Sequence, residues 1–151
     1  TVTPRAVGQG NSVGTQDAYY TFGGDPLPAS SPAVGSLYWN GSSWATGPAL
    51  PTNWAYMGSS GTYPSAVIGG GNSPSTPGNV APSNNCAVWD GSSWTTSTGI
   101  NSPRTQVASN SGGTAPTQNN AFIAAGGESP LFSATEEFTA AGVSTKTMTT
   151  S

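Results

Sequence analysis

Short runs of aromatic and β-branched residues alternate with stretches rich in glycine, proline, serine and threonine along the whole chain. Three such runs, at residues 19–22, 65–68 and 122–125, each end directly before a glycine pair. Runs of this length and composition are typical of buried strands. No long stretch keeps a 3.6-residue period without interruption by glycine or proline, so helices are not expected. The pattern predicts an all-β fold.

The same pattern returns about every 50 residues. Trp39-Asn-Gly-Ser-Ser-Trp44 reappears as Trp89-Asp-Gly-Ser-Ser-Trp94, and Phe138 follows Trp89 by 49 positions although the turn after it has diverged. Self-similarity at such a period is typical of repeat architectures. We therefore expect three repeats of one fold unit, at residues 1–50, 51–100 and 101–151.

Three further positions mark the repeats. Each unit has one residue near its start, then a Gly-Thr pair, then the glycine pair. In chain order these are Arg5, Trp54 and Arg104; Gly14-Thr15, Gly61-Thr62 and Gly113-Thr114; and Gly23-Gly24, Gly69-Gly70 and Gly126-Gly127. Glycine at a crowded strand end allows close approach and unusual backbone angles. The spacing predicts four short strands in each unit.

The third strand of each unit is expected to end at Trp39, Trp89 or Phe138, and the fourth to begin at Trp44 or Trp94. The Asn-Gly or Asp-Gly pair between them predicts a tight hairpin, because these residues tolerate the positive φ of such turns. Asn40-Gly-Ser42 also fits a glycosylation sequon, but Asp90 at the equivalent place favours the turn.

Four antiparallel strands in about 50 residues, repeated, are typical of a β-propeller blade. The sequence Phe22-Gly23-Gly24, followed by Trp39 and Trp44, resembles the kelch family, although the gap between the aromatic residues is shorter here. Together with Ala134-Thr-Glu-Glu-Phe138, the tryptophan hairpins are similar to kelch-like repeats of marine bacteriophage virion proteins, which include tail-fibre and structural proteins. The resemblance implies a kelch-like β-propeller with three blades in this chain.

A closed propeller has about 4 to 8 blades. Three blades therefore make an incomplete ring, and we expect it to be completed by another copy of the chain or by further chain. The chain begins without an initiator Met or a signal-peptide pattern, which favours a processed protein or a segment of a longer one.

The composition narrows the chemistry. Charged residues make up 6% of the chain and the net charge is −3. Only three of these residues are basic, too few to form a surface that follows the phosphates of a nucleic acid. The absence of histidine removes histidine catalysis and most zinc sites. The six acidic residues show no spacing that predicts a facing carboxylate pair. We expect no enzyme activity, no cofactor, no metal and no membrane span, and a buried apolar position for the single Cys86.

The segments that follow the glycine pairs differ most between units, at Asp25–Gly35, Gly71–Asn84 and Glu128–Ala134. Stiff, proline-rich loops gathered on one face of a scaffold are frequent binding sites, with plain surface connections as the alternative. The candidate ligand-binding residues on this face are Asp25, Trp54, Asn72 and Glu128. For Trp54 two interpretations remain, an exposed stacking platform for a sugar ring and, favoured, a packing role.

Three functions follow from these observations and the resemblance. The first is a non-enzymatic virion, tail-fibre or surface attachment protein that binds a host glycan or another virion protein. The second is a purely structural capsid-decoration or fibre component without a ligand. The third, disfavoured by the missing histidine, is a carbohydrate-active enzyme module. The expected location is the virion or the extracellular space, and the expected state is a homo-oligomer or part of a longer chain.

Overall fold

A computed structural model describes residues 5–6, 12–26, 34–76, 79–109, 120–124, 126, 135–139 and 142–146. Within these residues every regular element is a strand and none is a helix. The strands form three four-stranded antiparallel sheets and two two-stranded ribbons. The predicted all-β fold with four-stranded antiparallel units is confirmed. The described residues form no closed ring, and the propeller arrangement stays a prediction.

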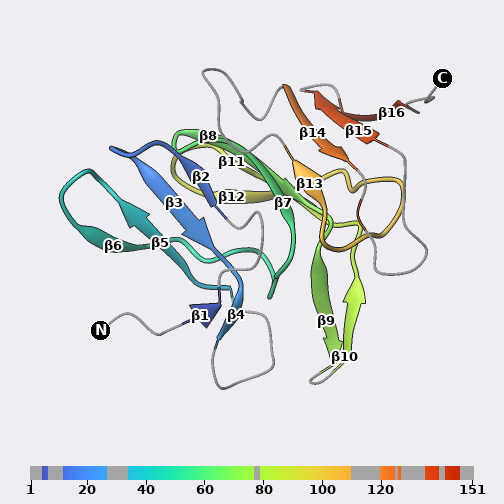
Figure 1. The fold of residues 1–151 in the computed structure, drawn as a ribbon, viewed down its shortest axis with the longest axis horizontal. Coiled ribbons are helices and arrows are strands. Elements are labelled where there is room, and N and C mark those ends of the chain that lie inside the picture. Colours follow the sequence, from blue (N-terminus) through green and yellow to red (C-terminus); the bar gives the residue numbers. More distant parts are fainter. Residues whose placement is uncertain are drawn as a thin grey trace.

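Each four-stranded sheet takes its strands in chain order, and the chain completes one sheet before it starts the next (Figure 1). Strand β4 (Asp25–Pro26) in the first unit, and β9 (Asn72–Thr76) and β10 (Asn79–Pro82) in the second, are inserted between strands of these sheets and belong to separate ribbons. The first sheet, at the left of the view, has the order β2-β3-β5-β6. Its strands are β2 (Ser12–Gly14), β3 (Tyr19–Phe22), β5 (Ser36–Trp39) and β6 (Trp44–Gly47).

The second and third sheets repeat this order. The second comprises β7 (Gly58–Thr62), β8 (Ser65–Gly69), β11 (Cys86–Trp89) and β12 (Trp94–Ser97). The third comprises β13 (Ala108–Ser109), β14 (Asn120–Ala124), β15 (Thr135–Thr139) and β16 (Gly142–Lys146). The predicted strand ends at Trp39, Trp44, Trp89 and Trp94 are confirmed, while β15 continues one residue past Phe138.

Two ribbons include segments after the glycine pairs that the sequence predicts as loops. β9 (Asn72–Thr76) pairs with β10 (Asn79–Pro82), so the proline-rich segment 71–84 is largely a paired hairpin rather than an open connection. In the first unit β1 (Arg5–Ala6) pairs with β4 (Asp25–Pro26). Figure 1 places both ribbons on the lower side of the view, away from the sheets.

The glycine pairs have the predicted role, but their register is shifted by one residue in the second unit. Gly23 and Gly24 have φ of 62° and 88°, and the matching values belong to Gly70 and Gly71 at 67° and 80°. Gly69 instead ends strand β8. The Gly24 amide donates to the Trp54 carbonyl oxygen at 3.0 Å, and a Cβ on Gly23 would lie 2.3 Å from that oxygen. A side chain would therefore separate the units at this point.

The hairpin between Trp39 and Trp44 is held by a different mechanism from the predicted one. Gly41 takes the positive φ, at 90°, whereas Asn40 does not. The Asn40 side-chain oxygen accepts hydrogen bonds from the Ser42 and Ser43 amides at 3.0 and 2.9 Å. Such an Asx turn fixes the four-residue loop. Asp90 makes the equivalent bonds to its two serines in the second sheet.

The first and second sheets share one apolar core. Tyr20 and Phe22 on β3 are buried against Trp89 and Ala87 of β11 in a single hydrophobic cluster. Cys86 is buried beside Ile100 and Val107, as predicted, and burial raises the pKa of its thiol to about 12. A thiol with so high a pKa stays protonated and unreactive at neutral pH.

Serine residues connect the innermost strands of the three sheets. Ser12, Ser59 and Ser109 occupy equivalent register positions on β2, β7 and β13. The Ser59 hydroxyl donates to the Ser12 carbonyl at 2.9 Å, and the Ser109 hydroxyl donates to the Ser59 carbonyl at 2.7 Å. The same hydrogen bond thus links each sheet to the preceding one, and we call this series the serine ladder.

Candidate functional site

An open hollow of about 430 Å³ lies at the hairpin end of the first sheet. Its volume is within the range of small-ligand sites. Three aromatic residues, one from each of β3, β5 and β6, form most of its wall. The lining residues are Gly14, Thr15, Gln16, Tyr19, Trp39 and Trp44.

The aromatic rings of the hollow are exposed to an unusual degree. Trp44 is 50% exposed and Tyr19 is 36% exposed. The Trp44 ring lies 6.3 Å from that of Tyr19 in an edge-to-face arrangement and 5.6 Å from that of Trp39. Exposed apolar clusters of this kind mark interaction sites, because burying them would release ordered water. We call Tyr19, Trp39 and Trp44 the open face.

Local hydrogen bonds hold the open face in position. The Trp39 indole N–H donates to the Gln16 carbonyl oxygen at 3.1 Å, which ties the turn after β2 to the third strand. Trp39 and Trp44 are direct cross-strand partners, and the Asn40 turn fixes the loop between them. The rings are therefore arranged before any partner arrives, which lowers the entropy cost of binding.

The chemistry of the hollow is that of a binding surface. Its lining supplies aromatic faces and uncharged hydrogen-bonding groups from Thr15, Gln16 and Tyr19, and it contains no carboxylate, amine, thiol or imidazole. General acid–base chemistry needs such groups within reach of a substrate. Across the part of the chain that the structure describes, no cluster of three metal-ligating side chains occurs.

The second sheet carries the same aromatic pair in a covered state. Trp89 is 1% exposed and Trp94 is half-buried. The Trp89 and Trp94 rings lie 5.0 and 6.0 Å from the ring of Tyr20 in the first sheet. The Trp94 indole N–H also donates to the Tyr20 hydroxyl at 3.2 Å. The open face of the first sheet is thus the equivalent of a surface that the second sheet buries against a neighbouring sheet.

Two of the four predicted site residues are brought close together. Ala55, which follows Trp54, pairs with Asn72 through two backbone hydrogen bonds of 3.0 and 2.7 Å. Trp54 is 1% exposed, and its indole N–H donates to the Gly70 carbonyl oxygen at 2.6 Å. The exposed stacking platform is therefore wrong for Trp54, which packs in the core because its indole edge is satisfied by backbone there.

The remaining predicted residues do not add to a site. The side-chain oxygen of Asn72 is buried and has no hydrogen-bond partner among the described residues. Asp25 begins strand β4, where its backbone pairs with Ala6, and it occupies the same position after the glycine pair as Asn72. Glu128 lies outside the described residues. Tyr19, Trp39 and Trp44, which line the hollow, are not among the predicted site residues, although Trp39 and Trp44 are the two tryptophans of the repeated Trp-Asn-Gly-Ser-Ser-Trp pattern.

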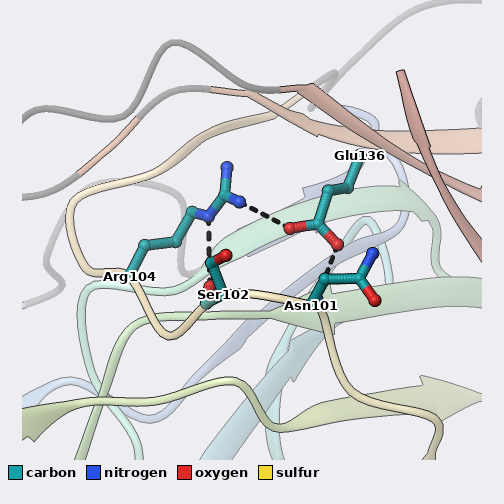
Figure 2. Close-up of polar contacts among 4 residues, drawn as sticks. All are labelled: Asn101, Ser102, Arg104 and Glu136. Atoms are coloured by element: carbon teal, nitrogen blue, oxygen red, sulfur yellow. Dashed lines mark hydrogen bonds and ion pairs between the residues drawn. The ribbon is translucent and has the colours of Figure 1, made fainter. Parts of the chain in front are cut away.

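A buried ion pair is a second feature that the sequence did not predict (Figure 2). The Arg104 guanidinium donates to Glu136 at 2.5 Å, and each side chain is 1% exposed. The other Glu136 oxygen accepts a hydrogen bond from the Asn101 amide at 2.7 Å, and Arg104 Nε donates to the Ser102 carbonyl oxygen at 3.3 Å. The pair joins the segment before β13 to strand β15, and neither residue lines the hollow.

A scan against protein-family models found no matching family, and a search of curated proteins found no match. Within the described residues there is also no helix with the length and apolar character needed to cross a membrane. The resemblance to kelch-like repeats stays a prediction from the sequence.

Proposed function

We propose that this chain is a non-enzymatic attachment or assembly module of an extracellular structure, of the virion or tail-fibre kind, and that it binds its partner through the open face. One observation carries the proposal. A preformed aromatic surface with Trp44 half exposed stands at one end of the sheets. Large exposed aromatic side chains raise the risk of aggregation, so their presence favours a surface that is covered in use.

The neutral surroundings of the open face support a partner that is recognised by packing. The chain has only nine charged side chains, three basic and six acidic, and none lines the hollow. Charged partners are recognised mainly by opposite charges. A flat apolar partner is therefore favoured, either the ring face of an uncharged sugar or an aromatic protein surface.

Binding assays with one variant test this proposal. The wild-type chain and Trp44→Ala are compared on an array of glycans and against purified proteins of the same assembly. We expect Trp44→Ala to weaken the interaction about tenfold or more, equivalent to about 1.4 kcal/mol of lost stacking and burial. The matched control is Ala45→Ser, which changes an exposed position on the same strand. Equal binding by Trp44→Ala and wild type would contradict the proposal.

The purely structural role, without a soluble ligand, is supported by the second sheet. There the equivalent tryptophans are covered by Tyr20 and Phe22 of another sheet, with the Phe22 and Trp94 rings 5.2 Å apart. This favours a protein partner over a glycan at the open face. Binding to a glycan that Trp44→Ala abolishes would instead favour attachment to a host surface.

A further inference from the structure

We infer that the partner of the open face is a second copy of this chain, whose third sheet stacks head-to-tail on the first sheet. This inference rests on the proposed function, because it names the occupant of the same surface. Three features of the described residues support it: the internal interface between the first two sheets, the serine ladder, and the residues at matching register positions of the third sheet.

The interface between the first and second sheets is the template. It brings Tyr20 and Phe22, on one face of β3, against Trp89 and Trp94 of the second sheet. The contact combines stacked rings with the hydrogen bond from Trp94 to the Tyr20 hydroxyl. A sheet of this kind therefore presents two different faces, one with the hairpin tryptophans and one with the residues that cover them.

The register of the first sheet places the open face on the tryptophan side. Tyr19 pairs with Trp39, and Trp39 pairs with Trp44. In the second sheet the same positions are Ala66, Trp89 and Trp94. Because side chains alternate along a strand, Tyr19 lies on the opposite face of β3 from Tyr20. The first sheet thus offers its tryptophan face on the side away from the second sheet.

The serine ladder has the polarity required for continuation between copies. Each hydroxyl donates to a carbonyl of the preceding sheet. Among the described residues the ladder starts at Ser12 and ends at Ser109. In a head-to-tail arrangement Ser12 of one copy would follow Ser109 of the other, so that the Ser12 hydroxyl donates to the Ser109 carbonyl as Ser59 donates to Ser12.

The third sheet has suitable residue types at the positions that cover tryptophans. Phe122 pairs with Glu137 on the neighbouring strand and so occupies the register position that Tyr20 has in the first sheet. Ala124 occupies the position of Phe22. The sequence thus places an aromatic residue and a small residue at the two register positions that cover tryptophans in the first sheet.

A head-to-tail interface joins two different surfaces, so it forms a ring if the rotation closes and a filament if it does not. Two copies contribute six four-stranded sheets, within the range of about 4 to 8 sheets in closed rings of this type. Two copies of the chain therefore form a ring with two identical interfaces.

Light scattering across a dilution series tests the association. We expect wild type to have twice the 15.0 kDa mass of one chain. Trp44→Arg would place a charge in the interface and should raise the dissociation constant about thirtyfold or more. Ala45→Arg adds the same charge to the other face of β6 and should leave the mass doubled. A wild-type monomer, a larger open assembly, or an unchanged Trp44→Arg dimer would overturn the inference.

A mixing experiment tests the head-to-tail geometry. Phe122→Arg disables the covering face and Trp44→Arg the open face, so each variant alone has no intact interface. In the mixture, the intact open face of the first variant meets the intact covering face of the second, which leaves one working interface and restores a doubled mass. Circular dichroism establishes that both variants are folded. A mixture that stays monomeric would overturn head-to-tail stacking. A Phe122→Arg variant that stays dimeric on its own would also overturn it, in favour of a symmetric contact between two open faces.

The inference and the proposed function fail in different ways. If wild type is a monomer but binds a glycan or another protein with an affinity that Trp44→Arg reduces, the second copy is wrong and the binding role of the open face stands. If wild type is a monomer and Trp44→Arg changes no interaction with the same ligands, both are wrong.

Discussion

The first and second sheets contain the same tryptophan hairpin in opposite environments. In the second sheet Trp89 is 1% exposed and Trp94 is half-buried against Tyr20, whereas in the first sheet Trp44, the equivalent of Trp94, is 50% exposed beside an open hollow. The turns have the same hydrogen bonds and the strands the same register. The difference therefore comes from the presence of an adjacent sheet, and a scaffold element of one repeat becomes a candidate interface in another.

The second and third sheets also differ at a buried position of the repeat. Arg104 and Glu136 form an ion pair in the third unit, and the Asn101 amide donates a hydrogen bond to the other carboxylate oxygen of Glu136. Removing one member of such a pair leaves an uncompensated buried charge, which costs about 3–5 kcal/mol. The three polar groups therefore depend on one another.

The equivalent positions of the second sheet are all apolar. In the repeat, Trp54 corresponds to Arg104 and Ala87 corresponds to Glu136. Pro51, which has no amide hydrogen, corresponds to the amide donor Asn101, 50 positions later. Trp54 and Ala87 belong to the same core cluster. A large ring and a small residue thus occupy the repeat positions that hold the ion pair in the third sheet.

The largest expected effect distinguishes covered from open tryptophans. Trp89→Ala should lower the free energy of unfolding by about 3–5 kcal/mol, as expected for a buried tryptophan. Trp44→Ala, at the open face, should lower it by about 0.5 kcal/mol or less in the monomer. Urea denaturation at low protein concentration measures both. Equal losses for the two variants would show that the environments do not differ as described.

Breaking the ion pair should lower the free energy of unfolding by a similar or slightly smaller amount. Glu136→Ala leaves Arg104 buried without its partner and should cost about 3 kcal/mol. The double variant Arg104→Trp with Glu136→Ala transplants the pair of the second sheet and should recover most of that loss. Urea denaturation of both variants decides the point, and a double variant less stable than Glu136→Ala would show that the two sheets do not share one packing geometry.

A smaller effect is expected for the hydroxyl between the first two sheets. Tyr20→Phe removes the acceptor of the Trp94 indole and the 2.9 Å contact with Ser36, at a cost of about 1–2 kcal/mol. The matched control is Tyr19→Phe on the open face, with an expected change of about 0.5 kcal/mol or less. Thermal unfolding ranks the two variants, and a Tyr19→Phe effect as large as that of Tyr20→Phe would contradict the assignment.

The smallest effect is a pH dependence of stability that the Asp90 turn has and the Asn40 turn lacks. Amide hydrogen bonds from Ser93 and Ser92 lower the pKa of the exposed Asp90 carboxyl to about 2, below the value of about 3.9 in an unfolded chain. Its contribution to stability is therefore full above about pH 4 and is lost as the pH falls towards 2. Asp90→Asn, which copies Asn40, should remove this part of the pH dependence. Parallel stability–pH profiles for the two proteins would contradict the turn's role.

Much of the strand layout follows from the sequence because it depends on local chemistry. The tryptophans on either side of an Asn-Gly or Asp-Gly turn fix where one strand ends and the next begins. The glycine register of the second unit does not follow from the sequence because Gly69, Gly70 and Gly71 are consecutive. Contacts with later residues, among them the hydrogen bond from the Gly71 amide to the Arg104 carbonyl, accompany the positive φ of Gly70 and Gly71. The β9–β10 ribbon was missed because its prolines disfavour regular pairing.

The candidate site was harder to predict, since it depends on which surfaces are covered. Trp44 and Trp94 hold the same place after the repeated turn, yet Trp44 is half exposed and Trp94 is partly covered by Tyr20 of another sheet. The turn sequence alone does not distinguish them. The partnership of Arg104 with Glu136 likewise links residues 32 positions apart, and their types alone did not single out this pair among the acidic and basic residues.

Fluorine NMR of the chain labelled with fluorotryptophan tests the central claim most directly, with each resonance assigned from a Trp→Phe variant. If the open face is an interface, the Trp44 resonance should shift as the protein is concentrated or its partner is added, while the Trp89 resonance stays in place. A Trp44 resonance that never moves, or one that moves together with Trp89, would contradict the claim that the first sheet presents a binding surface where the second presents a core.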